Sequence, residues 1–454
     1  MGITQLMAKY NIPIPRYTSY PTVPYWDKDT PDHQRWFEVV KETFDQTNKT
    51  KGIAIYIHLP YCEKLCTYCA CTKHITKNHD LEAPYVDALL KEWQTYLDTF
   101  EDRPVIRELH LGGGTPTFFS TDSLQRLLSF IINSGEKHAE YEFSFEAHPN
   151  NTSKAHLQTL FDLGFRRLSL GVQDFDPEVQ KVINRIQTYE TVDEVVNNAR
   201  EIGYESVNFD LIYGLPKQKA SSVEDTLKKV RVLNPDRIAF YSYAHVPWKE
   251  KGQRGFTDED IPTGEEKREL YEIGKRLLLE IGFEDIGMDH FSKPTDKLNI
   301  ARNQGTLHRN FMGYTTSEAD MIIGLGASSI SDAGRAYMQN EKNIEFYKNK
   351  INSNEPAFIK GHFLNHEDRT IKRAILDIAC QGKLTFNDDL VNYMTFQMLT
   401  QLKAMEEEGV IVRNPRGFAL TPELGKMFLR NVCSVFDIRM QDKAEQDVKF
   451  SKSI

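Results

Sequence analysis

Residues 53–71 read IAIYIHLPYCEKLCTYCAC, a strand-like segment followed at once by a group of cysteines. The run from 53 to 59 is rich in β-branched and aromatic side chains, which predicts a β-strand. The cysteines that follow lie within ten residues: Cys62, Cys66, Cys69 and Cys71. The chain has only six cysteines, so this grouping indicates metal or redox chemistry rather than a disulfide framework.

Strand and helix alternate from this point to about residue 245. The predicted strands are 53–59, 106–111, 141–146, 167–172, 207–212 and 237–243. Helices are expected between them at 84–100, 153–163 and 191–202, the last opening on a capping-box spacing from Thr191 to Glu194. Six such units in succession predict parallel strands joined by right-handed crossovers. A closed eight-stranded barrel and an open doubly wound sheet both fit, and each places its active site at the C-terminal ends of the strands.

Polar residues recur on one face of three of these strands, close to their C-terminal ends. Side chains alternate between the two faces of a strand, so residues two apart share a face. The residues concerned are Ser144 and Glu146, Asn208 and Asp210, and Ser169, Gly171 and Gln173. Parallel strands are normally apolar on both faces, so the pattern predicts either a solvated site or satisfied polar layers inside a barrel.

The rest of the chain suggests three domains, with boundaries near residues 50 and 364. Residues 1–50 are expected to form an N-terminal strap, residues 51–364 the barrel with an extension, and residues 365–454 a separate C-terminal domain with a polar, docked tail. Helices near 367–380 and 396–408, followed by a hairpin of 410–412 and 418–420, resemble a winged-helix module. The small-residue stretch 324–330 predicts a strand or turn near a ligand, or a tight packing point.

Composition limits the class of function. The chain has 454 residues and a net charge of −9, from 56 Lys and Arg against 65 Asp and Glu. An acidic chain is a poor general binder of nucleic acid, so we expect no nucleic-acid partner. We also expect no membrane association, since no run of about 18 apolar residues occurs. The N-terminus lacks the apolar core of a secretory signal, and a cytoplasmic location is predicted.

The cysteine spacing, C-x3-C-x2-C-x-C, indicates which metal chemistry to expect. Thiolates are soft ligands that suit iron–sulfur clusters and zinc. A structural zinc site usually takes two separated pairs of ligands, and here only His58 and His74 are available to complete such a shell. Three thiolates on one loop would instead hold three irons of a cluster and leave the fourth iron open to a cofactor or substrate.

Taken together, these motifs resemble the oxygen-independent coproporphyrinogen III oxidases, a family of the radical S-adenosylmethionine (SAM) superfamily. The three-cysteine loop with Tyr68 before its last cysteine marks the superfamily, and Cys71 with the PRYTSYPT stretch at 15–22 marks the family. Further matching stretches are 112–117, 171–175, 184–185, 210–216, 243–245, 287–291 and 308–316. The resemblance implies an α/β fold: a partial parallel (βα)6-type barrel with the strap and the smaller C-terminal domain.

The resemblance also implies a reaction. Cys62, Cys66 and Cys69 would hold a 4Fe–4S cluster whose fourth iron binds SAM. An electron from the cluster would release a 5′-deoxyadenosyl radical that takes a hydrogen from a propionate side chain. Loss of CO2 and one electron would leave a vinyl group. Two propionates would react in this way, so that coproporphyrinogen III becomes protoporphyrinogen IX.

Further site residues follow from the resemblance, position by position. Those expected to contact a cofactor are Tyr56, Tyr68, Gly113, Gly114, Thr115, Glu146, Gln173, Arg185, Asp210, Ala244 and Ile330. Arg185 is expected to pair with a carboxylate as a bidentate fork. Cys71 is expected to act in turnover without binding iron, and Arg16 in the strap is expected to meet a substrate propionate. The family implies two SAM molecules, a low-potential flavodoxin- or ferredoxin-like electron donor, and a monomer.

Two features depart from the family pattern, and other functions compete with the oxidase. His148 stands where relatives more often carry an acid, and Ala70 where glycine is usual. A heme chaperone of the same superfamily would lack Cys71 and the 15–22 stretch. A porphyrin-acting radical enzyme with another reaction, and a zinc protein without activity, are the remaining alternatives. Cys380 and Cys433, which lie in helical patterns, are expected to be buried in the core.

Overall fold

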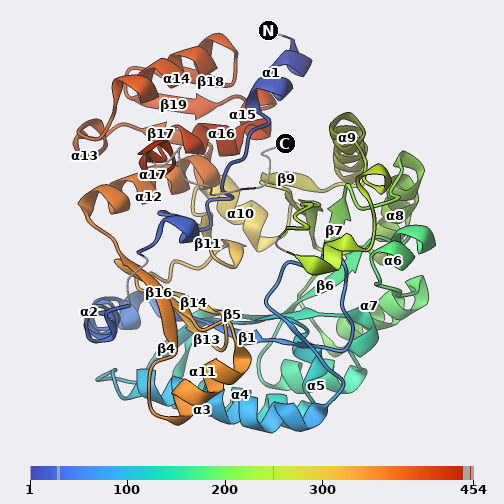
Figure 1. The fold of residues 1–454 in the computed structure, drawn as a ribbon, viewed down its shortest axis with the longest axis vertical. Helices are drawn as coiled ribbons and strands as arrows, with labels where there is room; N and C mark the ends of the chain where they lie inside the picture. Colours follow the sequence, from blue (N-terminus) through green and yellow to red (C-terminus); the bar gives the residue numbers. More distant parts are fainter. Residues whose placement is uncertain (1, 28–30, 249, 443–449, 451–454) are drawn as a thin grey trace.

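The computed structural model describes residues 2–27, 31–248, 250–442 and 450. Within these residues twelve strands form one large sheet, in the order β16-β15-β14-β13-β1-β4-β5-β6-β7-β8-β10-β9. Figure 1 shows this sheet in the lower and right-hand part of the molecule, with the C-terminal helices gathered above it on the left. The two edge strands, β16 and β9, do not pair with each other, so the described sheet is an open, partial barrel.

The centre of the sheet is a run of seven parallel strands in the described chain. In spatial order they are β13 (Ile322–Leu325), β1 (Ile53–Leu59), β4 (Val105–Gly113), β5 (Glu136–Ala147), β6 (Arg167–Gln173), β7 (Ser206–Tyr213) and β8 (Arg237–Ser242). All six predicted strands are confirmed, and β1 has the predicted bounds. The seventh strand, β13, ends in the first two residues of the small-residue stretch 324–330, which the sequence left open between strand and turn, and the stretch then leads to β14 at Ile330.

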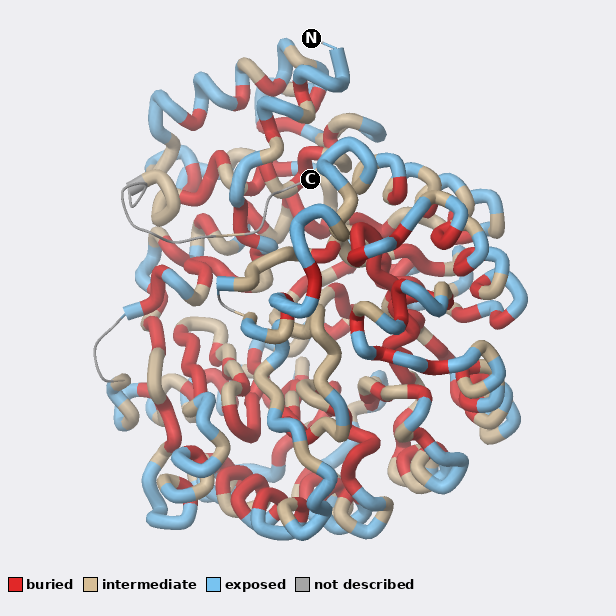
Figure 2. Tube along the Cα trace, turned by 45° about the vertical axis from the view of Figure 1, so that its right-hand side comes forward, coloured by how far each residue is buried: buried red, intermediate tan, exposed pale blue. Residues whose placement is uncertain are grey.

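Helices cover the outer, apolar face of this run. They are α2 (His33–Lys51), α3 (Glu82–Leu97), α4 (Thr121–Ser134), α5 (Lys154–Asp162), α6 (Pro177–Val182), α7 (Tyr189–Ile202), α8 (Ala220–Leu233), α9 (Gly264–Glu280) and α11 (Ile344–Asn352). The outward side chains of β1, Ile53, Ile55, Ile57 and Leu59, are fully buried beneath them. Figure 2 shows buried residues along the strands and exposed ones on the outer sides of the helices. Because the apolar side chains of the strands fill the outer face, their polar side chains lie on the inner face.

Helix α7 corrects one prediction of the sequence analysis. The helix begins at Tyr189, and the N-cap is Thr188, whose side-chain oxygen accepts a hydrogen bond from the N–H of Thr191 at 3.2 Å. The capping box predicted from Thr191 to Glu194 is therefore wrong by one turn. A threonine stands at both positions, and in the structure the helix begins after the first of them, where Thr188 has extended backbone angles.

Antiparallel strands extend the sheet on both sides. On one side lie β14 (Ile330–Asp332), β15 (Ala336–Asn340) and β16 (Phe358–Phe363), and on the other β10 (His290–Ser292) and β9 (Glu284–Gly287). Two short pairs stand apart, β2 (Tyr61–Cys62) with β3 (His74–Ile75) and β11 (His308–Asn310) with β12 (Gly313–Thr315). The helix α10 (Lys297–Gln304) follows β10.

The C-terminal part has the element order expected of a winged-helix-like module. This order is α12 (His366–Gln381), β17 (Lys383–Thr385), α13 (Asp388–Val391), α14 (Phe396–Glu407), β18 (Ile411–Asn414) and β19 (Gly417–Leu420). The helices α15 (Leu424–Met427), α16 (Leu429–Ser434) and α17 (Ile438–Asp442) complete it. Cys380 and Cys433 are buried in its core, as predicted. Of the predicted tail, residues 443–449 and 451–454 lie outside the described residues, while the Phe450 ring contacts Tyr25 at 6.1 Å.

The first fifty residues contribute to two different cores. Helix α1 (Ile3–Tyr10) packs on the C-terminal module, where the Tyr10 hydroxyl donates to Glu408 at 2.5 Å. Helix α2 packs on the barrel through Trp36 and Phe44. The segment between them crosses from one to the other, with Tyr17 and Tyr20 buried. It therefore spans the seam between the two parts of the molecule. The division at residues 50 and 364 stays a proposal.

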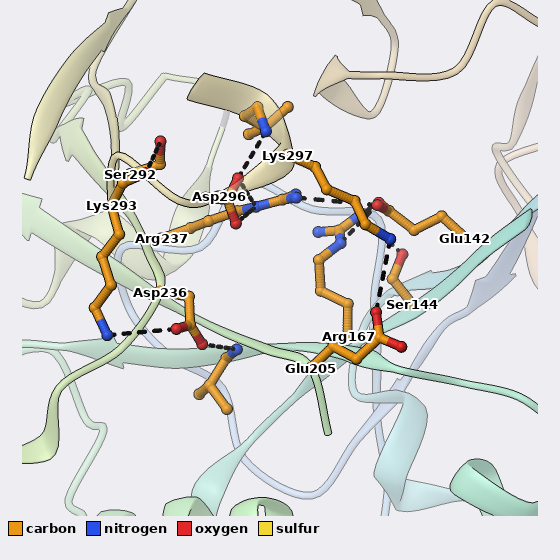
Figure 3. A network of polar contacts seen from close by, with 12 residues as sticks. Glu142, Ser144, Arg167, Glu205, Asp236, Arg237, Ser292, Lys293, Asp296 and Lys297 are labelled. Carbon is orange, nitrogen blue, oxygen red and sulfur yellow. Dashed lines mark hydrogen bonds and ion pairs between the residues drawn. The ribbon is translucent and has the colours of Figure 1, made fainter. Parts of the chain in front are cut away.

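The N-terminal ends of the parallel strands are closed by a buried ionic network (Figure 3). Arg237 on β8 donates from Nε to both carboxylate oxygens of Asp296, at 2.9 and 2.8 Å, and its Nη2 lies 3.9 Å from Glu142 on β5. Arg167 on β6 donates to the same Glu142 at 2.9 Å. The inner face thus carries a satisfied polar layer at this end. Among the described residues, no helix is both long and apolar enough to cross a membrane.

Candidate active site

The cysteine loop leaves β1 at the C-terminal end of the parallel run and is held against the end of α6. The N–H of Thr67 donates to the carbonyl of Ile183 at 3.0 Å. The side-chain amide of Asn184 donates to the carbonyl of Leu65 at 2.7 Å. Both contacts lie between the first and last cysteines, so they fix the loop at the place where the parallel strands end.

The thiols of this loop have distinct surroundings. Cys62 Sγ lies 3.3 Å from the hydroxyl of Thr115, and Cys66 Sγ accepts a hydrogen bond from Arg185 Nη1 at 3.5 Å. A hydrogen bond from Cys71 lowers the pKa of Cys69 to about 6, whereas burial raises the pKa of Cys62 to about 11. Cys71 itself is exposed. A thiol with a lowered pKa is a ready metal ligand, since the thiolate is the form that binds.

Tyr56 and His58 share the inner face of β1 and lie beside the glycines that follow β4. Nε2 of His58 lies 2.9 Å from the carbonyl of Thr72, which can only accept, so that nitrogen carries the proton. Nδ1 therefore accepts from the Tyr56 hydroxyl at 3.1 Å. Burial lowers the pKa of His58, which is consistent with this neutral ring. The contact with Thr72 ties the end of the cysteine loop to β1.

These contacts argue against the zinc alternative. Both ring nitrogens of His58 are already hydrogen-bonded, and His74 is exposed with its ring against Tyr61. His58 therefore offers no free ring nitrogen to a metal, and the His74 ring lies against Tyr61. His58 is instead a residue that holds Tyr56 and the loop in place.

Gly113 and Gly114 allow the backbone of β4 to pass close to this group. Gly113 has φ of +112°, and a Cβ there would lie 2.7 Å from the His58 ring. A Cβ on Gly114 would lie 2.6 Å from the backbone of Pro60. The N–H of Gly113 donates a hydrogen bond to Oε2 of Glu146 at 3.2 Å. The glycines thus bring the cysteine loop, Tyr56 and Glu146 to one point.

Replacing Gly113 by alanine tests this close approach. We expect Gly113→Ala to lose about 2–3 kcal/mol of unfolding free energy, because a side chain at positive φ is strained and displaces His58. Urea denaturation measures the loss. The matched control is Gly264→Ala, where a Cβ would meet nothing within 4 Å. Equal stability of the two variants would contradict the assignment.

Gln173 and Arg185 meet over Gly171, at the end of β6. A Cβ on Gly171 would lie 2.7 Å from both Arg185 Nη2 and Gln173 Nε2. Arg185 donates from Nε and Nη2 to the carbonyl of Gly171, and from Nη1 to Cys66. Nε and one N–H of Nη2 are therefore occupied by a carbonyl, while Nη1 and the second N–H of Nη2 still form a fork, so the predicted bidentate pairing with a carboxylate stays a prediction.

Asp210 completes the inner face at the end of β7. Ser169 donates to its Oδ2 at 3.1 Å and Asn208 donates to its Oδ1 at 3.0 Å. Burial, and then the charge of Glu146, raise the pKa of Asp210 to about 7. Glu146 itself is about half exposed, with a side-chain exposure of 45%. Glu146 and Asp210 thus form a carboxylate pair on the inner face, with Glu146 about half exposed and Asp210 partly buried.

The remaining predicted cofactor residues lie around this centre. Gln253 donates to the carbonyls of both Tyr68 and Ala244 at 3.2 Å, which joins the cysteine loop to the segment after β8. Ile330 lies on the other side: a Cβ on Gly324, the partner of Tyr56, would be 2.5 Å from its carbonyl. The structure therefore brings the predicted residues to one end of the barrel, with Ala244 and Ile330 at opposite flanks.

Two further residues from the sequence analysis have defined contacts. His148 accepts the N–H of Asn150 at 3.2 Å and so caps the turn of residues 149–151. Arg16 of the strap donates to the carbonyl of Ser242 at 3.5 Å and stacks over Tyr241 at 5.8 Å. The strap thus reaches the C-terminal end of β8, close to the carboxylate pair.

His110 was missed at the sequence level. Its ring lies nearly parallel to that of Tyr56, with centroids 6.0 Å apart, and its Nδ1 lies 2.8 Å from the Ser144 hydroxyl. The signal was present, because His110 shares the inner face of its predicted strand with Glu108 and Gly112. What the sequence does not show is the register that sets His110 beside Tyr56.

Comparison with known proteins identifies the class that this fold and loop define. Residues 56–230 match the model of the radical SAM superfamily. The chain is 36% identical to the oxygen-independent coproporphyrinogen III oxidases of Salmonella typhimurium and Escherichia coli, in each case over 99% of this chain and 98% of the relative.

A solved structure agrees with the sequence comparison. The chain is similar to coproporphyrinogen III oxidase from Escherichia coli, a radical SAM enzyme, with a TM-score of 0.88 and 34% identity over 96% of this chain and 98% of that one. The chain belongs to the oxygen-independent coproporphyrinogen III oxidase family.

Proposed function

We propose that the protein catalyses the oxygen-independent oxidative decarboxylation of coproporphyrinogen III to protoporphyrinogen IX. Two propionate side chains each lose a hydrogen atom, CO2 and one electron and become vinyl groups. The observation that carries this conclusion is the match to enzymes of that name over 99% of the chain, which includes the strap and the C-terminal module as well as the barrel. A heme chaperone is not favoured by these comparisons.

The reaction requires a 4Fe–4S cluster and SAM, and the thiols of the cysteine loop suit such a cluster. Among the described residues, no three His, Cys, Asp or Glu side chains are grouped closely enough to share one metal ion. A cluster does not require that, since each thiolate binds a different iron. We propose Cys62, Cys66 and Cys69 as its ligands, with the cation of Arg185 beside Cys66 to offset their charge. When bound, cluster and SAM supply a radical able to abstract hydrogen from an unactivated carbon.

The chain's own residues are proposed to bind and orient SAM. Glu146, held by the Gly113 N–H, is proposed to accept from the ammonium group of SAM. Asp210 and Gln173 are proposed to bind its hydroxyl groups, and the backbone of Gly113–Thr115 and Tyr56 to line the pocket. Arg185 offers Nη1 and the second N–H of Nη2 to a ligand, because Nε and the first N–H of Nη2 serve the Gly171 carbonyl. Tyr68, Ala244 and Ile330 are proposed to border the same cofactor space.

The strap and Cys71 complete the proposed site. Arg16 at the end of β8 is proposed to receive a substrate propionate, since among the described residues its hydrogen bond goes to a backbone carbonyl and its other contact is the Tyr241 ring. Cys71, exposed beside Cys69, is proposed to act in turnover without binding iron. We also propose two bound SAM molecules, a flavodoxin- or ferredoxin-like donor and a monomer. The six cysteines are all free, which supports a reducing, cytoplasmic location.

The decisive experiment is anaerobic reconstitution with iron and sulfide. SAM, a low-potential reductant, coproporphyrinogen III and a cell extract as electron acceptor are added, and protoporphyrin is measured by chromatography after oxidation. Product from the wild type and none from Cys62→Ala supports both the reaction and the cluster. Cleavage of SAM without loss of a propionate would leave the radical class standing and reject the substrate.

The pKa of Asp210 predicts a pH dependence of SAM binding. A carboxylate that accepts from the ligand must be ionised, so binding strengthens as pH rises through the pKa of about 7. We expect the dissociation constant to fall about tenfold between pH 6 and pH 8 and to level off above. Equilibrium dialysis on the cluster-loaded protein measures it. In Asp210→Asn this dependence is expected to vanish; its persistence would assign it to another group.

A further inference from the structure

A cavity of about 350 Å³ opens where the strap, β11, the ends of β13 and β14, α2 and α12 come together. It lies towards the opposite end of the inner face from the cysteine loop, since Ile322 in its wall pairs with Ala54 at the start of β1. Its lining carries five basic side chains and two acidic ones: Arg309, Arg335, Arg369, Lys372 and Arg373 against Asp320 and Asp332. In a chain of net charge −9, this excess of cations points to an anionic ligand.

Most of these cations already have partners in the protein. Arg335 pairs with Glu42, Lys372 with Asp332 and Arg373 with Asp377. Arg309 differs: it is only 6% exposed, and its Nε and Nη1 have no hydrogen-bond partner within the described chain. A guanidinium does not lose its proton, and a buried charge without a partner is costly. Arg369 also has no carboxylate partner among the described residues, but it is exposed and donates to the carbonyl of Asn365, so Arg309 is the buried cation in this lining that still requires an anion.

A chain of contacts connects Arg309 with the proposed active site. Its guanidinium lies 4.7 Å from the centre of the Tyr314 ring, which in turn contacts the His290 ring at 5.3 Å. His290 Nε2 lies 3.4 Å from the hydroxyl of Tyr241, and Arg16 stacks on Tyr241 at 5.8 Å. Arg309 and Arg16 thus stand at the two ends of one aromatic row, Arg309 on the cavity side and Arg16 on the side of the carboxylate pair.

The substrate of the proposed reaction has four propionates, of which two are decarboxylated and two persist in the product. The reacting pair must come to the cysteine-loop end, so the persisting pair needs cations elsewhere. We infer that Arg309 binds a persisting propionate and that the cavity holds the non-reacting edge of the tetrapyrrole. This inference rests on the proposed function. Arg309 is then a positioning residue: by holding one propionate, it determines which of the four side chains reach the radical.

Two porphyrins distinguish the reacting edge of the substrate from the non-reacting edge. Coproporphyrin III has all four propionates, whereas deuteroporphyrin IX has only the two that persist. Binding of each to the reconstituted protein is measured by the shift of the Soret band. We expect Arg309→Gln to weaken both roughly 10- to 100-fold, the range for a lost hydrogen bond to a charged group. Arg373→Gln, which removes a paired cation from the same lining, is expected to change binding less than about twofold.

Kinetics and stability complete the test. In Arg309→Gln we expect KM for coproporphyrinogen III to rise with kcat nearly unchanged, and the melting temperature to stay level or rise because an unpaired buried charge is removed. Arg309→Lys keeps the charge and should bind deuteroporphyrin IX with intermediate affinity. Unchanged affinity of Arg309→Gln for deuteroporphyrin IX would overturn the inference, as would a loss confined to coproporphyrin III. Failure of the wild type to convert coproporphyrinogen III would instead reject the proposed function itself.

Discussion

The variant Cys69→Ala is expected to bind no cluster, while Cys71→Ala keeps its cluster and fails in turnover. Cys69 is the thiol whose pKa is lowered to about 6, and Cys71 is the exposed donor of the hydrogen bond that lowers it. Losing a ligand removes the cofactor that performs the chemistry, so we expect activity of Cys62→Ala, Cys66→Ala and Cys69→Ala to fall by roughly three orders of magnitude or more. Iron and sulfide content and decarboxylation, measured after identical reconstitution, check this.

Cys380→Ala is the matched control for this series, because that cysteine is buried in the C-terminal module. It should retain full iron content and activity. If Cys71→Ala lost its iron as completely as Cys69→Ala, Cys71 would be a ligand and the three-thiolate assignment would be wrong. If Cys69→Ala kept its cluster, the ligand set would have to include a residue outside the loop.

The central strands were predictable because each carries its own periodic pattern. β1 has the predicted bounds, and β7 differs from its prediction by one residue at each end. The exception is β5, which begins at Glu136, five residues before the prediction. Its first five residues, EKHAE, are polar and mostly exposed. They form a strand because β4 pairs with them at Val105 and Ile106. The flanking strands of three to six residues likewise depend on pairing with neighbouring strands.

The site was predictable where a residue type and its strand position agreed. Glu146 and Asp210 stood out on alternation alone, and their part in a solvated site stays a prediction. Asp210 lies at the end of the barrel that carries the candidate site. Glu142, which shares a face of β5 with Glu146, belongs to the satisfied ionic layer. Arg309 lies in the matching stretch 308–316, but the resemblance gave it no role, since its significance comes from its burial and from the absence of a partner for two of its nitrogens among the described residues.

The ionic layer predicts the largest effect on stability. We expect Arg237→Met to lower the unfolding free energy by about 3–5 kcal/mol, because it leaves the buried carboxylate of Asp296 without its partner. The side chains of Arg237 and Asp296 are only 7% and 6% exposed. Chemical denaturation at pH 7 measures the loss. The double variant Arg237→Met/Asp296→Asn should recover part of it, since asparagine is neutral and still caps α10 at Leu298.

The control and the pH dependence follow from the same layer. Lys297 pairs with Glu205 at 3.6 Å with both side chains more than half exposed, so Lys297→Met should change stability by less than about 0.5 kcal/mol.

Burial alone would raise the pKa of Glu142, but Arg167 and Arg237 outweigh it and hold that pKa at about 2. A carboxyl whose pKa is depressed on folding stabilises the protein above its unfolded pKa of about 4.5 and loses that contribution as pH falls towards 2. Wild-type stability should therefore decline across this window, and in Arg237→Met the decline should be shallower because Glu142 has lost one of its cations. A decline of equal slope in both proteins would show that Arg237 does not hold the pKa of Glu142 down.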